Sequence, residues 1–196
     1  MNDLSPFLPS KGSELLGTAM ESAAGNWNDW YSKHPEGFPC GEDSYRRAAE
    51  YLVDYEVEEW GAGMSKFGDM HYMGYRAVDG SPTQITDDVV DLCNYQSDVE
   101  AILMRHVLEH NENWREIFTN LCSSFTHRAV VIFFTPFNNF QKQIDFTEMG
   151  IDVPVLSLAI KDVNDLIPDN VTRRWERTVS PDTKYGEETL LYMEKK

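Results

Sequence analysis

The sequence predicts an α/β fold built around a mostly parallel β-sheet. Helical and strand patterns alternate from residue 45 onward, as expected when strands are connected through helices. Residues 98–104 end in a continuous apolar run, typical of a parallel strand that is buried on both faces. Residues 172–179 and 189–194 have the pattern of two strands joined by a turn with proline and glycine, which predicts an antiparallel hairpin at the end of the sheet.

The remaining elements follow in chain order. Ser13 is a suitable N-cap for a first helix, and apolar residues recur at helical spacing further along the chain. Residues 137–151 mix Asn, Gln and Phe, and we expect a loop and a helix there, over the open end of the sheet. Helices are expected over residues 14–24, 45–53, 113–123 and 162–167, and further strands over 55–57, 75–78, 89–90 and 129–134.

Composition indicates one globular domain. The chain has 196 residues, of which 41% are hydrophobic and 26% charged, as is usual for a soluble protein. No apolar run approaches the roughly 20 residues of a membrane-spanning helix, and the N-terminus lacks the pattern of a signal peptide. Cys40, Cys93 and Cys122 are odd in number and widely spaced, which predicts free thiols in a reducing, cytoplasmic setting.

The net charge of −16 argues against a nucleic-acid partner, because such a surface repels a phosphate backbone. The tight basic clusters are small, Arg46-Arg47 and Arg173-Arg174. A local basic patch could still bind a nucleic acid, but solubility is the interpretation we favour for the acidity.

Residues 55–81 combine a strand, a glycine turn, a short helix, a second strand and an acid. Gly61 and Gly63 allow a tight turn and a close approach of the backbone to a ligand. Asp79 lies 18 residues after Gly61, close to the spacing at which an acid binds the ribose hydroxyls of a nucleoside in a βαβ unit. An ordinary turn is the competing interpretation of the two glycines alone.

The residues around the turn favour a cationic nucleoside over a dinucleotide. Lys66 stands where a dinucleotide-binding loop has its third glycine, which disfavours a nicotinamide dehydrogenase. Glu59 precedes the turn, and its carboxylate would repel phosphate and suit a positive charge. S-adenosylmethionine, with an adenosine, a sulfonium and no phosphate, fits these features.

Three segments resemble the class I S-adenosylmethionine-dependent methyltransferases: Glu-Trp-Gly-Ala-Gly at 59–63, Ala-Val-Asp-Gly-Ser at 77–81, and His-Val-Leu-Glu-His at 106–110 followed by Asn113-Trp-Arg-Glu-Ile-Phe. The resemblance covers roughly residues 45–196. It implies a Rossmann-like three-layer αβα sandwich whose seven-stranded, mostly parallel sheet ends in a C-terminal antiparallel hairpin. It also implies a division into an N-terminal helical extension or lid at 1–43 and a cofactor-binding domain at 44–196.

The resemblance further implies a set of cofactor-binding residues. A methionine-side loop, a ribose acid and an adenine border are expected at the ends of successive strands, with an ordinary acidic loop as the equal alternative at Asp91. The expected residues are Glu59, Trp60, Gly61, Ala62, Gly63, Asp79, Gly80, Ser81, Asp91, Leu92 and Arg105.

Candidate substrate contacts lie in two aromatic segments. Trp27, Trp30 and Tyr31 either pack the N-terminal extension onto the domain or form a lid, and packing is the simpler interpretation. Phe137 follows the central strand, where selectivity for substrate is expected. We therefore predict substrate contacts at Trp30, Tyr31 and Phe137.

His106 is the candidate catalytic base. It follows the fourth strand at the edge where open α/β sheets bind ligands, and an imidazole titrates near neutral pH. Packing beside the cofactor is the alternative role. His106, Glu109 and His110 also spell a reversed zinc-protease pattern, but that motif needs a long helix and a further ligand, so we predict no metal site.

The sequence therefore predicts a methyltransferase whose acceptor is unidentified, with a small molecule favoured. A non-catalytic S-adenosylmethionine-binding or regulatory module is one alternative, because fold does not fix function. A metal-assisted RNA-end methyltransferase is the other.

Overall fold

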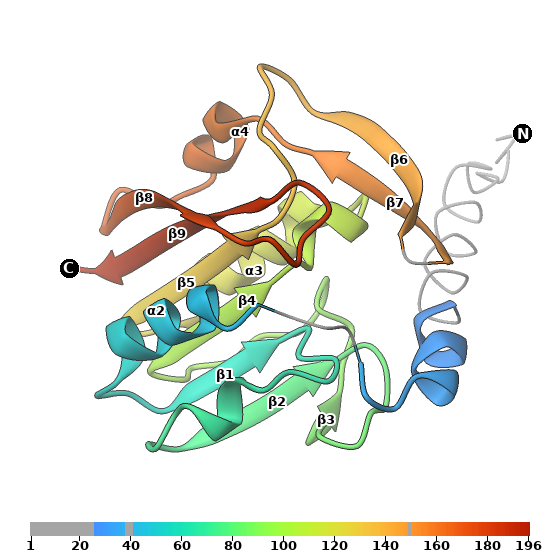
Figure 1. The fold of residues 1–196 in the computed structure, drawn as a ribbon. Helices are drawn as coiled ribbons and strands as arrows, with labels where there is room; N and C mark the ends of the chain where they lie inside the picture. Colours follow the sequence, from blue (N-terminus) through green and yellow to red (C-terminus); the bar gives the residue numbers. More distant parts are fainter. Residues whose placement is uncertain (1–25, 38–40, 149) are drawn as a thin grey trace, which may run out of the picture.

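The computed structural model describes residues 26–37, 41–148 and 150–196 (Figure 1). The helix predicted over 14–24 and the thiol of Cys40 lie outside these residues. In the described part, no helix is long and apolar enough to cross a membrane.

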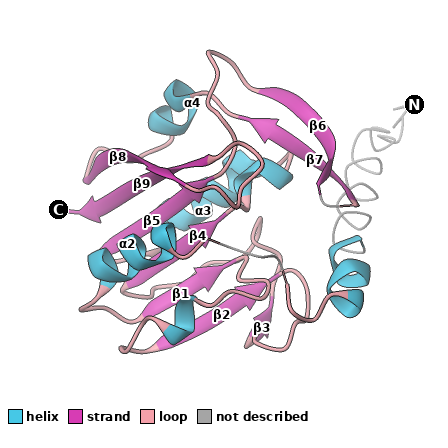
Figure 2. Cartoon of the chain, viewed as in Figure 1, coloured by secondary structure: helices cyan, strands magenta, loops and turns pink. Residues whose placement is uncertain are grey.

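A seven-stranded sheet forms the centre of the molecule (Figure 2). Its spatial order is β3 (Asp88–Val89), β2 (Tyr75–Asp79), β1 (Val57–Trp60), β4 (Ala101–Arg105), β5 (Arg128–Phe133), β9 (Glu187–Lys195) and β8 (Val171–Val179). The first five strands are parallel, and β9 runs antiparallel to both β5 and β8. The predicted fold class, with its C-terminal hairpin, is confirmed.

Helices cover both faces of this sheet, which gives three layers. Figure 1 shows α2 (Asp43–Leu52) in front of the sheet and α3 (Trp114–Ser124) behind it. The α2 face buries residues such as Leu52 and Leu103, whereas the α3 face buries Trp60, Met104 and Phe118. Side chains alternate between the faces along each strand, so every central strand contributes to both cores.

Three shorter helices connect the strands. α4 (Ile160–Asp165) adds Val163 to the α3-side core. The short helix predicted after the glycine turn is a single 3-10 turn, η1 (Phe67–Asp69). A second 3-10 turn, η2 (Leu108–His110), follows β4 and contains the last two residues of the histidine pattern.

The region from residue 137 to 151 differs from the prediction of a loop and a helix. It contains β6 (Lys142–Glu148), which pairs with β7 (Ile151–Ser157) in a separate two-stranded antiparallel sheet (Figure 2). The pairing has register irregularities, and Ile144 and Phe146 alternate with polar residues, a short strand pattern that the prediction of a helix overlooked. Cross-strand pairing to β7, which sequence periodicity does not report, makes this segment a strand.

A helix over residues 26–33 lies against the β6–β7 hairpin. Trp30 is buried in a cluster with Ile151 and Val153, and Asn26 donates a hydrogen bond to the Asp152 carbonyl oxygen at 2.9 Å. The ring of Trp30 therefore packs this helix against the hairpin, and its contact with substrate stays a prediction.

Candidate active site

The glycine turn after β1 has a backbone conformation that other residue types adopt only with strain. Gly61 and Gly63 have φ angles of +73° and +53°, in the left-handed region that favours glycine. A Cβ added to Gly61 would lie 2.2 Å from Cγ2 of Val107, and one added to Gly63 would lie 2.2 Å from the hydroxyl oxygen of Tyr31. Both positions therefore require glycine, for conformation and for space.

Asp79, at the end of β2, is bonded to this turn. Its Oδ2 accepts from the backbone N–H of Gly63 at 2.7 Å, and its Oδ1 accepts from the N–H of Ser81 at 2.7 Å. Thr83 Oγ1 also donates to the Gly63 carbonyl oxygen at 2.6 Å. Burial raises the pKa of Asp79, and the N–H bonds oppose that rise. The turn and the acid thus form one bonded unit, and their contact with cofactor stays a prediction.

Glu59 is buried on the α2 side of β1. It is 1% exposed, and its Oε2 accepts a hydrogen bond from the Tyr75 hydroxyl at 2.8 Å. Burial raises the pKa of Glu59 to about 7, although hydrogen bonds with Ser65, Tyr75 and Tyr45 oppose the rise. Its predicted contact with the cofactor stays a prediction.

The remaining predicted cofactor residues lie on the α3 side of the sheet and at the surface. Trp60 is fully buried and donates its indole N–H to Glu58 at 3.1 Å, and Leu92 belongs to the same core. Asp91 is exposed, and it accepts from the backbone N–H of Cys93 at 3.0 Å within its own turn. Gly80 has more space than Gly61, since an added Cβ would meet only the Val90 oxygen at 3.7 Å.

Arg105, predicted to bind cofactor, lies on the α2 side of β4 in a buried ion pair. Its Nε and Nη2 donate to Oε1 of Glu188 at 3.0 and 2.7 Å, and its guanidinium lies 4.5 Å from the centre of the Tyr45 ring. Two donors on one carboxylate oxygen fix both side chains. The structure therefore supports a positioning role for Arg105, and its contact with cofactor stays a prediction.

His106 follows Arg105 in an unusual backbone conformation. Its φ is +57°, the one positive φ of a non-glycine residue in the described ranges, and such strain clusters at functional sites. Its Nε2 lies 2.5 Å from Oε1 of Glu188, and its side chain is 24% exposed. A carboxylate can only accept, so Nε2 carries the proton and Nδ1 carries the lone pair.

The electrostatics of this pair favour a neutral imidazole beside a carboxylate. Burial lowers the pKa of His106 to about 4, with the charge of Arg105 adding to the effect. Burial raises the pKa of Glu188, but the hydrogen bond from His106 and the charge of Arg105 together lower it to about 2.

Sequence reasoning missed Glu188. The available signal was its register in the last strand, where it shares the α2-side face with Leu190 and Tyr192. An acid at such a position must have a buried partner.

The other members of the reversed zinc pattern have partners of their own. Glu109 accepts from the Phe134 N–H at 2.6 Å, and Nδ1 of His110 donates to the Pro154 carbonyl oxygen at 3.1 Å. Across the ranges described, no three His, Cys, Asp or Glu side chains are grouped so as to hold a metal ion.

The predicted substrate residues lie in two places. Tyr31 lies over the glycine turn, and its ring is 5.9 Å from that of Trp27, which in turn is 5.5 Å from His110. The ring of Phe137 packs against Phe133 at 5.0 Å and against Trp175, as part of the α3-side core. Tyr31 is thus close to the candidate site, whereas the contacts of Phe137 are those of a packing residue.

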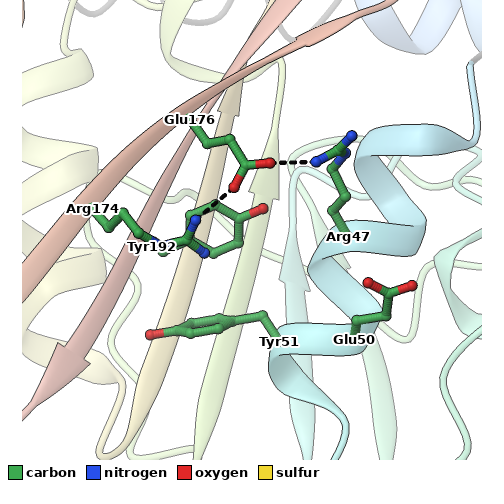
Figure 3. A pocket seen from close by; sticks show the side chains of 6 residues that line it. All are labelled: Arg47, Glu50, Tyr51, Arg174, Glu176 and Tyr192. Atoms are coloured by element: carbon green, nitrogen blue, oxygen red, sulfur yellow. Dashed lines mark hydrogen bonds and ion pairs between the residues drawn. The ribbon is translucent and has the colours of Figure 1, made fainter.

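A hollow between α2 and the C-terminal hairpin lies apart from this site (Figure 3). It brings together one arginine from each basic cluster, Arg47 and Arg174, and both pair with Glu176. Its volume of about 270 Å³ is below the usual range of ligand pockets. Because Glu176 pairs with both cations and Asp43 also pairs with Arg47, we assign this hollow to ion pairing on the surface.

No protein-family model and no curated protein matches this sequence. Solved structures do match its fold. A 1,6-didemethyltoxoflavin-N1-methyltransferase of Burkholderia thailandensis, with S-adenosylhomocysteine bound, has a TM-score of 0.61 at 13% identity over 99% of this chain and 93% of that one. The chain has the class I methyltransferase fold.

Other structures with this fold extend the comparison. Magnesium protoporphyrin IX methyltransferase of Synechocystis PCC 6803, with S-adenosylmethionine bound, has a TM-score of 0.55 at 14% identity over 78% of this chain and 76% of that one. A putative methyltransferase of Haloferax volcanii, in complex with the Trm112 activator, has a TM-score of 0.60 at 10% identity over 89% and 97%. The [4+2]-cyclase SpnF also matches, with a TM-score of 0.58 at 10% identity. The class I methyltransferase fold therefore accommodates more than one reaction.

Proposed function

We propose that this protein is an S-adenosylmethionine-dependent methyltransferase that acts on a small molecule. The observation that carries the proposal is the bond between Asp79 and the N–H of Gly63, which joins the ribose acid to the glycine turn. The same fold binds S-adenosylmethionine or S-adenosylhomocysteine in its structural neighbours, which supports this ligand.

Each predicted segment then has a task in binding. Gly61, Ala62 and Gly63 would receive the methionine part of the cofactor, beside the buried Glu59. Asp79 has lone pairs left after its two N–H bonds, and these would accept from the ribose hydroxyls. The other residues of the proposed cofactor site are Trp60, Gly80, Ser81, Asp91, Leu92 and Arg105.

The bound cofactor supplies a methyl group on a sulfonium, which a lone pair of the acceptor displaces in line. The task of the protein is to hold the acceptor at the carboxyl ends of the parallel strands, where positioning supplies much of the acceleration. His106 lies there with a neutral Nδ1, so it would accept a hydrogen bond from the acceptor. Glu188 and Arg105 hold it in place.

Residues 1–43 are proposed to act as a lid on the domain at 44–196. The contacts of Tyr31 with the glycine turn and of Trp27 with His110 support this proposal. They connect the helix over 26–33 to the proposed cofactor loop and to the histidine segment after β4. The Burkholderia neighbour is a methyltransferase of a small heterocycle, and the acidity of this chain also favours a small acceptor over a nucleic acid.

A second candidate function is that the protein binds S-adenosylmethionine but catalyses a reaction other than methyl transfer. The match to the cyclase SpnF favours keeping it, because that enzyme has the same fold. Transfer of a labelled methyl group to any acceptor would separate the two candidates. A metal-assisted reaction on an RNA end has less support, because His106, Glu109 and His110 each have a different partner.

Calorimetry on the full chain tests the proposed ligand. S-adenosylhomocysteine should bind, and NAD should not. Asp79→Ala should weaken this binding by about ten- to a hundred-fold, because charge-assisted hydrogen bonds contribute about 1.5–3 kcal/mol. Asp91→Ala, at an exposed position, gives a comparison for the adenine side. Binding of NAD without S-adenosylhomocysteine would exclude the proposal.

A further inference from the structure

Glu109 places a buried carboxyl group at the end of β5. The residue lies in η2 and is 1% exposed. Its Oε1 accepts the backbone N–H of Phe134, the residue that follows β5, at 2.6 Å. Since β4 and β5 are parallel neighbours, this carboxyl group lies at the same edge of the sheet as His106.

The second oxygen of this carboxyl group, Oε2, is buried and has no hydrogen-bond partner among the described residues. It is the one ionisable side-chain atom found in that state in those ranges. A buried polar atom without a partner is costly, and in a native structure it needs an explanation. A ligand that donates a hydrogen bond provides one.

The groups around Glu109 make it a better proton acceptor than Glu188, His106 or His110. Burial raises the pKa of Glu109 to about 7, although the backbone N–H groups of Glu109, Phe134 and Thr135 oppose the rise. The charge of Glu188 from β9, which Arg105 from β4 holds as an anion, adds to the rise. His106 and His110, on either side in the chain, have their pKa lowered to about 4 by burial. From β7, the Pro154 carbonyl group faces His110.

Aromatic rings line the same region. The ring of Phe134 lies 4.9 Å from that of His106, 5.3 Å from that of His110 and 6.1 Å from that of Tyr185. Trp27 adds a further ring against His110. Such surroundings favour a flat, aromatic ligand.

We propose that Oε2 of Glu109 binds the N–H or O–H of an aromatic methyl acceptor and takes its proton during transfer. This inference rests on the proposed function and names the acceptor class: a flat small molecule with a hydrogen on the atom to be methylated. That hydrogen leaves as a proton to Oε2, the electron pair it leaves behind forms the bond to the methyl carbon, and the carbon–sulfur bond breaks with its pair on sulfur. His106 then positions the acceptor through Nδ1.

Indole and 1-methylindole test this inference, because they differ in one N–H and neither titrates near neutral pH. Binding of each is measured by ligand-observed NMR on the full chain saturated with S-adenosylhomocysteine. Indole should bind about ten-fold more tightly at pH 8, the effect of one charge-assisted hydrogen bond, and its advantage should shrink at pH 6. Binding of S-adenosylhomocysteine is measured separately. A chain that does not bind S-adenosylhomocysteine would contradict the proposed function rather than this inference.

Glu109→Gln provides the matched variant. Its amide oxygen must keep the Phe134 N–H, so its free end becomes an NH₂ donor and the preference for indole should disappear. Glu112→Gln, three residues away and exposed, should retain the preference. Three results would each overturn the inference: equal binding of the two compounds to the wild type, no binding of either, or a preference that survives in Glu109→Gln. The wild-type result does not depend on the folding of any variant.

Discussion

Nε2 of His106 donates to Oε1 of Glu188 at 2.5 Å, although the two residues are 82 positions apart in the sequence. The same oxygen accepts from Nε and Nη2 of Arg105. One buried carboxylate therefore fixes the tautomer of the histidine and neutralises the arginine. This leaves Nδ1 of His106 as its one acceptor atom and makes Glu188 the centre of the site.

The first prediction separates His106 from Glu109 by kinetics, with an acceptor found by screening for labelled methyl transfer. Glu109→Gln should slow methylation by about 10²–10⁴-fold, the usual range for a positioned acid–base group. The wild-type rate should fall as pH drops through about 7, because protonation removes the basic Oε2. His106→Ala should cost about ten-fold, one lost hydrogen bond, and keep that pH dependence.

The opposite result would make His106 the base. In that case His106→Ala would lose the larger factor, and the wild-type rate would fall only near pH 4, where its imidazole gains a proton. His127→Ala, at an exposed histidine on the far side of β5, is the control for both variants.

The second prediction concerns the stability that Glu188 provides. Its folded-state pKa of about 2 lies below its ordinary value of 4.5, so its contribution is present above pH 4.5 and is lost as pH falls toward 2. Glu188→Gln should cost about 3–5 kcal/mol at pH 7, because it leaves Arg105 buried without a countercharge. The loss should be smaller at pH 3.

Urea unfolding at the two pH values measures this difference. Glu187→Gln, the adjacent and partly exposed acid, should change stability little at either pH. A Glu188→Gln protein as stable as the wild type at pH 7 would show that the ion pair contributes nothing net.

The third prediction concerns Glu59, whose pKa is shifted in the opposite direction. Its folded-state pKa of about 7 lies above its ordinary 4.5, so the stability it contributes is present below pH 4.5 and is lost as pH rises through 7. Glu59→Gln keeps an acceptor for the Tyr75 hydroxyl but cannot ionise. It should therefore gain up to about 3 kcal/mol relative to the wild type between pH 5 and pH 8.5, on the order of 2.5 pKa units.

Thermal or urea unfolding at pH 5 and pH 8.5 gives the comparison. Glu56→Gln, at the exposed acid before β1, is the control and should show the same pH dependence as the wild type. If Glu59→Gln also follows the wild-type curve, Glu59 remains ionised in the folded protein.

The fourth prediction tests the glycine turn. Gly61→Ala meets both a left-handed backbone and Val107, so it should destabilise the protein by about 2–5 kcal/mol, the sum of conformational strain and overpacking. Gly186 also has a positive φ, of +71°, but has no atom within 4 Å of an added Cβ. Gly186→Ala should therefore cost only the conformational part, about 1–2 kcal/mol.

Adding Val107→Ala to Gly61→Ala should recover part of the loss by removing the contact. Equal losses in the Gly61 and Gly186 variants would show that the turn relaxes away from Val107. Binding of S-adenosylhomocysteine should weaken in Gly61→Ala alone, because Gly186 lies in the turn of the C-terminal hairpin.

The sequence by itself determined the local features of this protein. The left-handed turn at Gly61 and Gly63 follows from the two glycines, and the spacing from Gly61 indicates the acid that ends β2, Asp79. The apolar runs of β4 and β5 predict buried parallel strands, and the turn after residue 179 predicts the hairpin of β8 and β9. These features depend on neighbours within a few residues, which a pattern records.

Only the tertiary structure decided how distant residues are paired. It placed Glu188 on His106 and Arg105, left Oε2 of Glu109 without a partner, and turned residues 142–148 into a strand by pairing them with β7. The physical reason is that burial, hydrogen-bond partners and pKa are set by whichever segments pack together. An acid in a sequence looks the same whether it faces water or a buried histidine, and only the packing of β9 beside β5 separates the two.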